Sequence, residues 1–254
     1  MPVLPGAEPF RHDAGRVGVL LCHGFTGTPQ SLRPWAEHLA AAGLSVRLPR
    51  LPGHGTRWQE LNLTRWEDWY AEVEHALDEL LSHCDDVFAM GLSMGATLAL
   101  RLAELRGPDV AGLVLVNPAL LSQDWRMRLL PLLRHVVPSL GGIGNDVKKP
   151  GVTELAYDRL PLKALHSLTK LWESTRADLG AVTQPILIFR SSEDHVIEPA
   201  SVAVLRAGVA STDVEERVCP NSYHVATLDH DAPAILAGSL AFVRAHSPSL
   251  SGGP

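Results

Sequence analysis

The sequence has few of the features that mark membrane-spanning or disulfide-bonded proteins. Its 254 residues contain three cysteines, without a CxxC pair, and only 6% are aromatic. An odd, unpaired cysteine set argues against a disulfide framework and fits a reducing compartment. No apolar run approaches the roughly 18 residues of a membrane-spanning helix, and the opening MPVLPGAEPF lacks the basic start and apolar stretch of a secretory signal. We therefore expect a cytoplasmic protein without stable membrane insertion.

Neither sign of charge dominates, and no internal repeat is visible. The formal net charge is −6, and the Lys and Arg residues are scattered. A mildly acidic surface gives no electrostatic reason to expect a nucleic-acid partner. The HExxH spacing and histidine clustering of metal sites are also missing, so we expect no metal and no organic cofactor. These absences favour a small-molecule substrate as the partner and leave the oligomeric state open.

Short apolar runs alternate with longer helical patterns along most of the chain. Several runs are continuously apolar, as strands covered on both faces are. Such alternation implies βαβ units and a mostly parallel sheet flanked by helices, which is an α/β fold. The predicted strands are Val17–Cys22, Ser45–Leu48, Val87–Met90, Val110–Val116, Pro185–Phe189 and Val214–Val218, and the predicted helices are Gln30–Ala42, Trp66–Leu81, Met94–Arg106, Pro199–Ala207 and Ala232–Ala245.

One long region breaks this alternation. Between Ala119 and Gly180 no strand pattern is visible, and apolar helical pieces take its place. An insertion of about 60 residues is too long for a plain connection. We interpret it as a cap over the carboxyl ends of the strands, where open α/β sheets bind their ligands. The expected organisation is a core of residues 1–118 and 181–246, a cap at 119–180 and a frayed polar tail at 247–254.

The segment Gly91-Leu92-Ser93-Met94-Gly95 lies between a predicted strand and a predicted helix. In a sharp strand-to-helix turn of the G-x-S-x-G type the serine is strained, and the residues two positions away must be small. Ser93 would then stand at the head of a helix with its hydroxyl exposed. We predict Ser93 as a nucleophile; the alternative is a tight packing turn with an idle serine.

A serine nucleophile needs two N–H donors for the negative charge that develops on the substrate carbonyl oxygen. In this type of turn one donor is the residue after the nucleophile, here Met94. The other comes from the loop after an early strand, and in His23-Gly24-Phe25-Thr26-Gly27 the natural candidate is Phe25. The alternative is an ordinary glycine-rich turn.

The base has to follow the last strand and precede the final helix. In proteins with this type of turn the catalytic residues occur along the chain in the order serine, acid, histidine. His224 meets this condition, and His230 is the second candidate. His23 and His54 are in loops that we expect to face the same cleft, and a histidine in such a place is more often a structural hydrogen-bonding residue than a catalyst.

The acid should follow the strand that comes immediately before the last strand. Pro185–Phe189 leads to both Glu193 and Asp194. Either carboxylate, once placed beside His224, would orient the imidazole and stabilise its charged form.

These motifs together resemble those of bacterial monoacylglycerol lipases and small carboxylesterases, members of the α/β-hydrolase superfamily. The matches span nearly the whole chain in the expected order, and the last is long. They are HGFTG at 23–27, LPGHGT at 51–56, WEDW at 66–69, GLSMG at 91–95, ELAY at 154–157, SSEDHV at 191–196 and SYHVATLDHD at 222–231.

The resemblance implies a small lid between strands six and seven, in agreement with the cap predicted above. It implies that a lid glutamate helps to hold a glycerol head group. Glu154 in the ELAY segment looks like its counterpart, although an ordinary surface glutamate would also fit one short segment. It further implies the triad Ser93, Asp194 and His224, and oxyanion N–H groups from Phe25 and Met94.

The function expected from these features is hydrolysis of carboxylic esters through an acyl-enzyme. An apolar cap over an apolar cleft suits medium to long acyl chains, as in a monoacylglycerol lipase or carboxylesterase. The alternatives are a thioesterase or another acyl hydrolase on the same scaffold, and a ligand-binding protein without activity.

Overall fold

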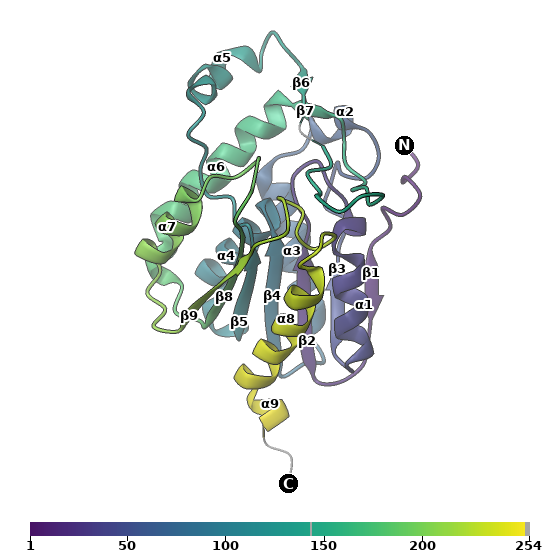
Figure 1. The fold of residues 1–254 in the computed structure, drawn as a ribbon, viewed down its shortest axis with the longest axis vertical. Coiled ribbons are helices and arrows are strands. Elements are labelled where there is room, and N and C mark those ends of the chain that lie inside the picture. The colour runs from purple at the N-terminus through teal and green to yellow at the C-terminus, as the bar shows by residue number, and fades with distance from the viewer. Residues whose placement is uncertain (143, 252–254) are drawn as a thin grey trace.

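A seven-stranded sheet forms the centre of the structure, a computed structural model that describes residues 1–142 and 144–251 (Figure 1). The strand order is β1-β3-β2-β4-β5-β8-β9. All neighbouring strands are parallel except β1 and β3, which pair in the antiparallel sense. The strands are β1 (Phe10–His12), β2 (Val17–Cys22), β3 (Ser45–Leu48), β4 (Asp86–Leu92), β5 (Gly112–Val116), β8 (Ile186–Ser191) and β9 (Val214–Cys219).

The central strands are continuously apolar because helices cover both of their faces. Every residue of β2 and β5 is buried. The predicted α/β-hydrolase fold is confirmed, and six strands lie within a few residues of their predicted positions. The strand β1 is not among the predicted strands, since its three residues are too few to carry a periodic pattern.

Two layers of helices enclose the sheet. The helices α1 and α8 share one apolar core with β2, β3, β4, β5 and β8, while α3, α4, α6 and α7 share the core on the opposite face. In Figure 1, α1 and α8 lie in front of the strands, and α3 and α4 lie behind them. The helices of these layers are α1 (Arg33–Ala41), α3 (Trp66–Leu81), α4 (Met94–Arg106), α6 (Leu162–Asp178), α7 (Ala200–Gly208) and α8 (Ala232–His246); shorter pieces are α2 (Trp58–Leu61) and the 3-10 helices η1 (Pro29–Leu32), η2 (Gly107–Asp109) and η4 (Leu179–Ala181).

The long segment between β5 and β8 lies beyond the carboxyl ends of the strands (Figure 1). In the strand order of the sheet, this segment separates the fifth strand, β5, from the sixth, β8. The resemblance implies a lid between strands six and seven, one position later. The expectation that it contains no strand is wrong, because two three-residue strands pair antiparallel within it. Its elements before α6 are η3 (Trp125–Leu129), α5 (Leu130–Leu133), β6 (Ser139–Gly141) and β7 (Arg159–Pro161).

The end of the chain is more ordered than its composition suggests. Residues 248–251 form α9 (Pro248–Ser251) instead of a frayed tail. The hydroxyl of Ser247 donates a hydrogen bond to the Asp86 carboxylate at 2.6 Å, and the Ser249 N–H donates to the same oxygen at 3.1 Å. A carboxylate at the start of β4 therefore orders this segment. Residues 252–254 lie outside the described residues.

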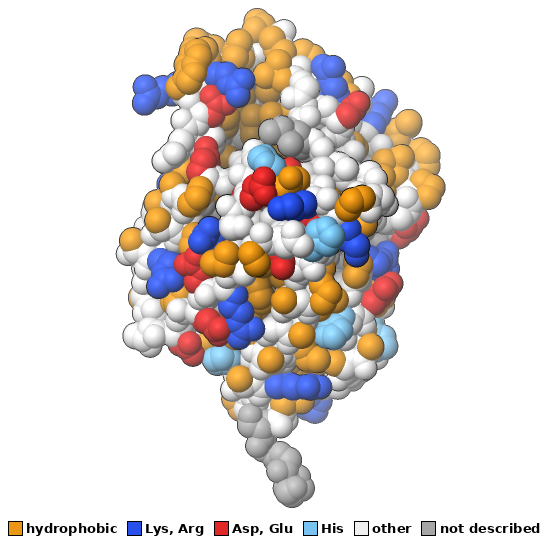
Figure 2. All heavy atoms as spheres, in the orientation of Figure 1, with side chains coloured by type: hydrophobic (Ala, Val, Ile, Leu, Met, Phe, Trp, Pro, Cys, Tyr) orange, Lys and Arg blue, Asp and Glu red, His pale blue; other side chains and the backbone are white. Residues whose placement is uncertain are grey.

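Apolar side chains gather on the surface at the end of the molecule where α5 lies (Figure 2). Trp125, Leu132 and Val136 of this segment are 68%, 75% and 78% exposed. Within residues 1–142 and 144–251, no helix combines the length and the apolar character needed to cross a membrane.

Candidate active site

Ser93 occupies a strained turn between the end of β4 and the start of α4. Its backbone has φ 57° and ψ −118°, in the left-handed half of conformational space that non-glycine residues rarely adopt. A Cβ atom on Gly95 would lie 1.9 Å from the carbonyl oxygen of Cys22, and one on Gly91 would lie 2.3 Å from the carbonyl carbon of Gly95. Both glycines are therefore required by the close approach of strand and helix, as the G-x-S-x-G pattern predicts.

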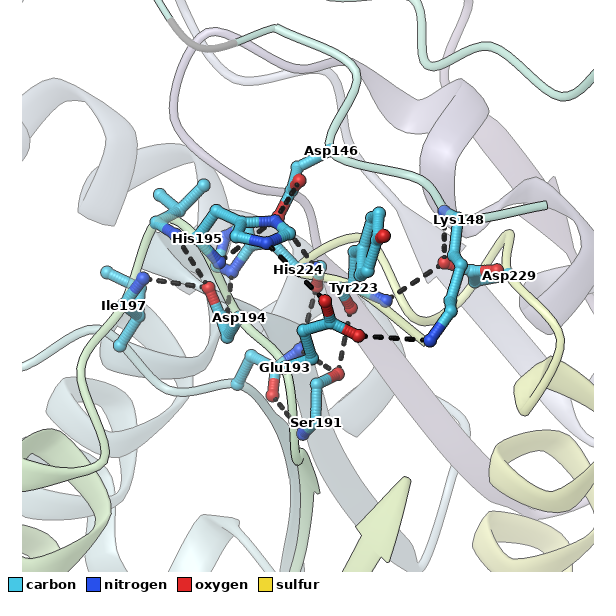
Figure 3. Close-up of polar contacts among 12 residues, drawn as sticks. Asp146, Lys148, Ser191, Glu193, Asp194, His195, Ile197, Tyr223, His224 and Asp229 are labelled. Atoms are coloured by element: carbon cyan, nitrogen blue, oxygen red, sulfur yellow. Dashed lines mark hydrogen bonds and ion pairs between the residues drawn. The ribbon is translucent and has the colours of Figure 1, made fainter. Parts of the chain in front are cut away.

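His224 and Asp194 form a hydrogen-bonded pair (Figure 3). The Nδ1 atom of His224 lies 2.8 Å from Asp194 Oδ2, while Asp194 Oδ1 accepts the main-chain N–H groups of Val196 and Ile197, each at 2.8 Å. Because an ionised carboxylate only accepts, Nδ1 carries the proton and Nε2 is left as the basic atom. This is the protonation state that a general base needs.

The electrostatics of this pair favour a charged imidazole. Burial alone would lower the pKa of His224, but the hydrogen bond and charge of Asp194, together with the charges of Glu154 and Asp146, raise it above its ordinary value of 6.5. Burial would raise the pKa of Asp194, yet its bonds to His224 and to main-chain N–H groups lower it below 3.8. The site thus stabilises the ion pair that forms when the histidine takes up a proton.

Within the described residues, the second candidates for acid and base form no hydrogen bond with the side chains of His224 and Asp194. Glu193 is half exposed and pairs with Lys148 at 3.0 Å, and His230 is exposed. His23 accepts the N–H of Leu51 at its Nε2 atom, and burial lowers its pKa to about 4. His54 is fully buried, and burial lowers its pKa well below 6.5. These two histidines are neutral and act as structural hydrogen-bonding residues.

Ser93 and His224 are anchored to consecutive residues at the end of β5. The N–H of Ser93 donates to the carbonyl oxygen of Val116 at 2.9 Å. The side-chain amide of the next residue, Asn117, donates to the carbonyl oxygen of His224 at 2.8 Å. Among the described residues no direct hydrogen bond joins the Ser93 hydroxyl to the imidazole, and such bonds often tighten only when substrate binds. The shared anchor nonetheless holds the serine turn and the histidine loop side by side.

Asn117 is a positioning residue that sequence reasoning misses. It is buried, with φ 44°. Its side-chain oxygen accepts the Ser191 N–H at 2.8 Å, and the Ser191 hydroxyl donates to the carbonyl oxygen of Tyr223 at 2.8 Å. This side chain thus links the end of β8, which leads to the predicted acid, to the loop of the predicted base, while the serine turn is bonded to the neighbouring Val116 carbonyl. The available signal was a polar residue directly after an apolar strand and before a proline.

One predicted oxyanion donor follows the serine in the chain, and the other belongs to a loop that packs against the serine. Met94 begins α4, so its N–H is one of the four that a helix leaves without an internal acceptor. The loop that carries Phe25 lies against Ser93, because a Cβ atom on Gly24 would be 3.6 Å from the Ser93 Cβ. The rings of His54 and Trp69 pack against Phe25, with centroids 6.2 Å and 5.7 Å away.

Glu154, on the segment before β7, lies against the same loop. A Cβ atom on Gly27 would be 2.7 Å from Glu154 Oε1. The Glu154 N–H donates to the Asn145 side chain at 2.7 Å, which fixes the backbone at this point. Burial raises the pKa of Glu154 to about 7, against the opposing influence of His224. The carboxyl group therefore lies against the loop of the predicted oxyanion donor, and its pKa is influenced by the charge of the predicted base.

Other nucleophiles and metal sites find little support in the described residues. Cys22, Cys84 and Cys219 are buried free thiols, and burial raises the pKa of Cys22 and of Cys219 to about 12. Such thiols are not thiolates at neutral pH. No group of three or more His, Cys, Asp or Glu residues within the described ranges is arranged to hold a metal ion.

The chain is similar in sequence to several known proteins. The family described as serine aminopeptidase, S33, matches residues 14–231. A thermostable monoacylglycerol lipase of Bacillus sp. (strain H-257) is 46% identical over 251 residues, 97% of this chain and 98% of that protein. A carboxylesterase of Bacillus subtilis (strain 168) is 25% identical over 225 residues, 88% of this chain and 91% of that protein.

Solved structures of lipolytic enzymes are also similar to this chain. A chain from a structure described under LipS and LipT, two metagenome-derived lipolytic enzymes, has a TM-score of 0.94 and 42% identity, and covers 96% of this chain and 100% of that one. A monoacylglycerol lipase of Paleococcus ferrophilus shares the fold, with a TM-score of 0.79 and 21% identity over 94% of this chain and 100% of that one. The chain therefore belongs to the α/β-hydrolase family described as serine aminopeptidase, S33, and its resemblance to the bacterial monoacylglycerol lipases and small carboxylesterases is confirmed.

Proposed function

We propose that this protein hydrolyses carboxylic esters, with Ser93 as nucleophile, His224 as general base and Asp194 as its partner. The observation that carries the proposal is the common anchor at Val116 and Asn117, which holds the strained serine turn beside the loop of the histidine that pairs with Asp194. The family match supports it.

In the proposed reaction the Ser93 hydroxyl oxygen attacks the ester carbonyl carbon while Nε2 of His224 takes the hydroxyl proton. The N–H groups of Phe25 and Met94 stabilise the oxyanion. When the intermediate collapses, the carbon–oxygen bond to the alcohol breaks and the alcohol leaves with the proton from His224. Water then attacks the acyl-enzyme by the same steps and releases the carboxylic acid.

We propose a monoacylglycerol or a related ester with a medium to long acyl chain as the substrate. The 46% identical relative is named a monoacylglycerol lipase and is matched over nearly its full length, which supports this choice. The apolar cap surface around Trp125 and Leu132 is suited to lipid. Glu154 would hold the glycerol hydroxyl groups from its place against the loop that carries Phe25. A cytoplasmic location is proposed as well, and the three free thiols support it.

A substrate panel tests the proposal. It compares monoacylglycerols, triacylglycerols, nitrophenyl esters, amides and acyl-CoA across acyl chain lengths. Ser93→Ala should lower turnover on the order of 10⁴-fold or more, while Ser211→Ala, remote from the site, should not change it. A fluorophosphonate should label Ser93. Near-normal activity of the Ser93 variant would refute the mechanism, and a maximum of kcat/KM on acyl-CoA would indicate a thioesterase.

A further inference from the structure

The cap reaches the catalytic histidine through Asp146. The main-chain N–H of His224 donates to Asp146 Oδ2 at 3.0 Å, and the N–H of Val225 donates to the Asp146 carbonyl oxygen at 3.0 Å. The other carboxylate oxygen, Oδ1, lies 2.8 Å from His195 Nδ1 in the acid loop (Figure 3). The Asp146 side chain is only 10% exposed. A cap residue is therefore bonded to both catalytic loops.

A second carboxylate makes the reciprocal contact. Asp229, on the histidine side, accepts the main-chain N–H groups of Lys148 and Lys149 at 2.6 Å and 3.0 Å, and that of Tyr223 at 3.0 Å. Asp229 is 1% exposed. Each segment thus supplies a carboxylate to N–H groups of the other. We call this pair, Asp146 with Asp229, the carboxylate clasp.

The clasp is stronger than the surface pairing next to it. Hydrogen bonds from N–H groups to an ionised carboxylate are among the stronger ones in proteins, and their loss leaves buried donors unsatisfied. The Lys148–Glu193 ion pair, by contrast, joins groups that are 32% and 50% exposed, and such pairs contribute little. The clasp therefore contributes more than this ion pair to holding residues 145–149 in place.

Asp146 also adds negative charge next to the base. The titratable groups that face it are His224 of the histidine loop, His195 of the acid loop and Glu154 of the cap. His195 is in turn faced by Glu193, Asp194 and the ring of Tyr223. The charge of Asp146 helps to raise the pKa of His224. The same charge stabilises the imidazolium that forms when the serine is deprotonated.

We propose that Asp146 is a positioning residue through which the cap holds His224 in its catalytic place, and that Asp229 fastens the cap segment that carries it. This inference rests on the proposed function, because it assumes that His224 is the base. It makes the cap part of the catalytic apparatus, since a cap movement that shifts residues 145–149 also releases the N–H of His224.

The test compares Asp146→Ala, Asp146→Asn and Asp158→Ala on a short nitrophenyl ester, with active sites counted by fluorophosphonate titration. Asp158 is an exposed aspartate of the same segment whose side chain makes no hydrogen bond or ion pair within the described residues, so it is the matched control. We expect Asp146→Ala to lower kcat per active site by about 10- to 100-fold, with KM changed much less. Asp158→Ala should stay within about twofold.

The pH profile separates positioning from folding. Removing the Asp146 charge should move the acidic midpoint of kcat/KM to lower pH in both variants. Asp146→Asn keeps an acceptor for the His224 N–H, so it should recover part of kcat without restoring the midpoint. If the alanine variant does not fold, the asparagine variant alone decides the test. An unchanged kcat per active site with an unmoved midpoint would overturn the inference. An active Ser93→Ala enzyme would instead overturn the proposed function.

Discussion

One carboxylate oxygen of Asp194 lies 2.8 Å from Nδ1 of His224, and the other oxygen accepts the main-chain N–H groups of Val196 and Ile197. This arrangement fixes the position of the carboxylate as well as the tautomer of the imidazole. An acid that is itself held by N–H groups stays ionised and cannot rotate away from its histidine.

Replacing Asp194 by Asn should keep the shape of the site and remove its function. The amide would present a donor or a neutral acceptor to Nδ1 and favour the wrong tautomer, so kcat should fall on the order of 10⁴-fold. Steady-state kinetics on a nitrophenyl ester measures this. Glu193→Gln is the matched control, because its exposed pair with Lys148 should matter little. If both variants retain similar activity, Asp194 is not the acid.

The raised pKa of His224 predicts the acidic limit of activity. The histidine must be neutral to accept the serine proton, so kcat/KM should fall as the pH drops through the pKa of the free enzyme. Since Asp194, Glu154 and Asp146 hold that pKa above 6.5, the midpoint should lie above 6.5. A profile measured from pH 5 to 9 checks this. A midpoint below 6.5, or a flat profile down to pH 5, would contradict the assignment.

The sequence predicted the parts of the site that depend on local geometry. The spacing around Ser93 follows from the close approach of Gly91 and Gly95, and the order of serine, acid and histidine follows from the order of the strands. Between Glu193 and Asp194 the residues alone gave no decision, and only the family pattern favoured the second. The choice depends on which side chain turns towards the histidine loop, and that is a tertiary contact.

Asn117, Asp146 and Asp229 lay beyond sequence reasoning for the same reason. Each is a single polar residue whose partners are distant in the chain: 107 positions separate Asn117 from His224, and 78 separate Asp146 from it. No periodic pattern marks such a residue. The short strands β6 and β7 were missed because three residues show no alternation.

Gly95→Ala should strongly destabilise the fold. A methyl group there would lie 1.9 Å from the carbonyl oxygen of Cys22, a backbone atom that cannot move without shifting β2. We expect the free energy of unfolding to fall by about 3 kcal/mol or more. Gly180→Ala is the control, since a Cβ atom there meets nothing within 4 Å. Denaturant unfolding of both variants measures the difference; equal stabilities would show that the turn can relax.

Glu154 should act on the alcohol part of the substrate and leave the acyl part unaffected. Its carboxyl faces the loop of Phe25, and its pKa of about 7 leaves it partly protonated at neutral pH, able both to donate to and to accept from hydroxyl groups. A 1-monoacylglycerol and the ethyl ester of the same acid differ only in that alcohol. For Glu154→Ala we therefore expect kcat/KM on the monoacylglycerol to fall by about tenfold or more, as the loss of hydrogen bonds to an ionisable group implies.

The value of kcat/KM on the ethyl ester should change much less in this variant. The matched control is Glu67→Ala, an exposed glutamate of α3, which should leave the ratio between the two substrates unaltered. Because the ratio compares two substrates in one preparation, a partly unfolded variant cannot produce the effect. An equal loss on both esters would show that Glu154 supports His224 and does not bind the head group. Such support would agree with the contribution of the Glu154 charge to the raised pKa of His224.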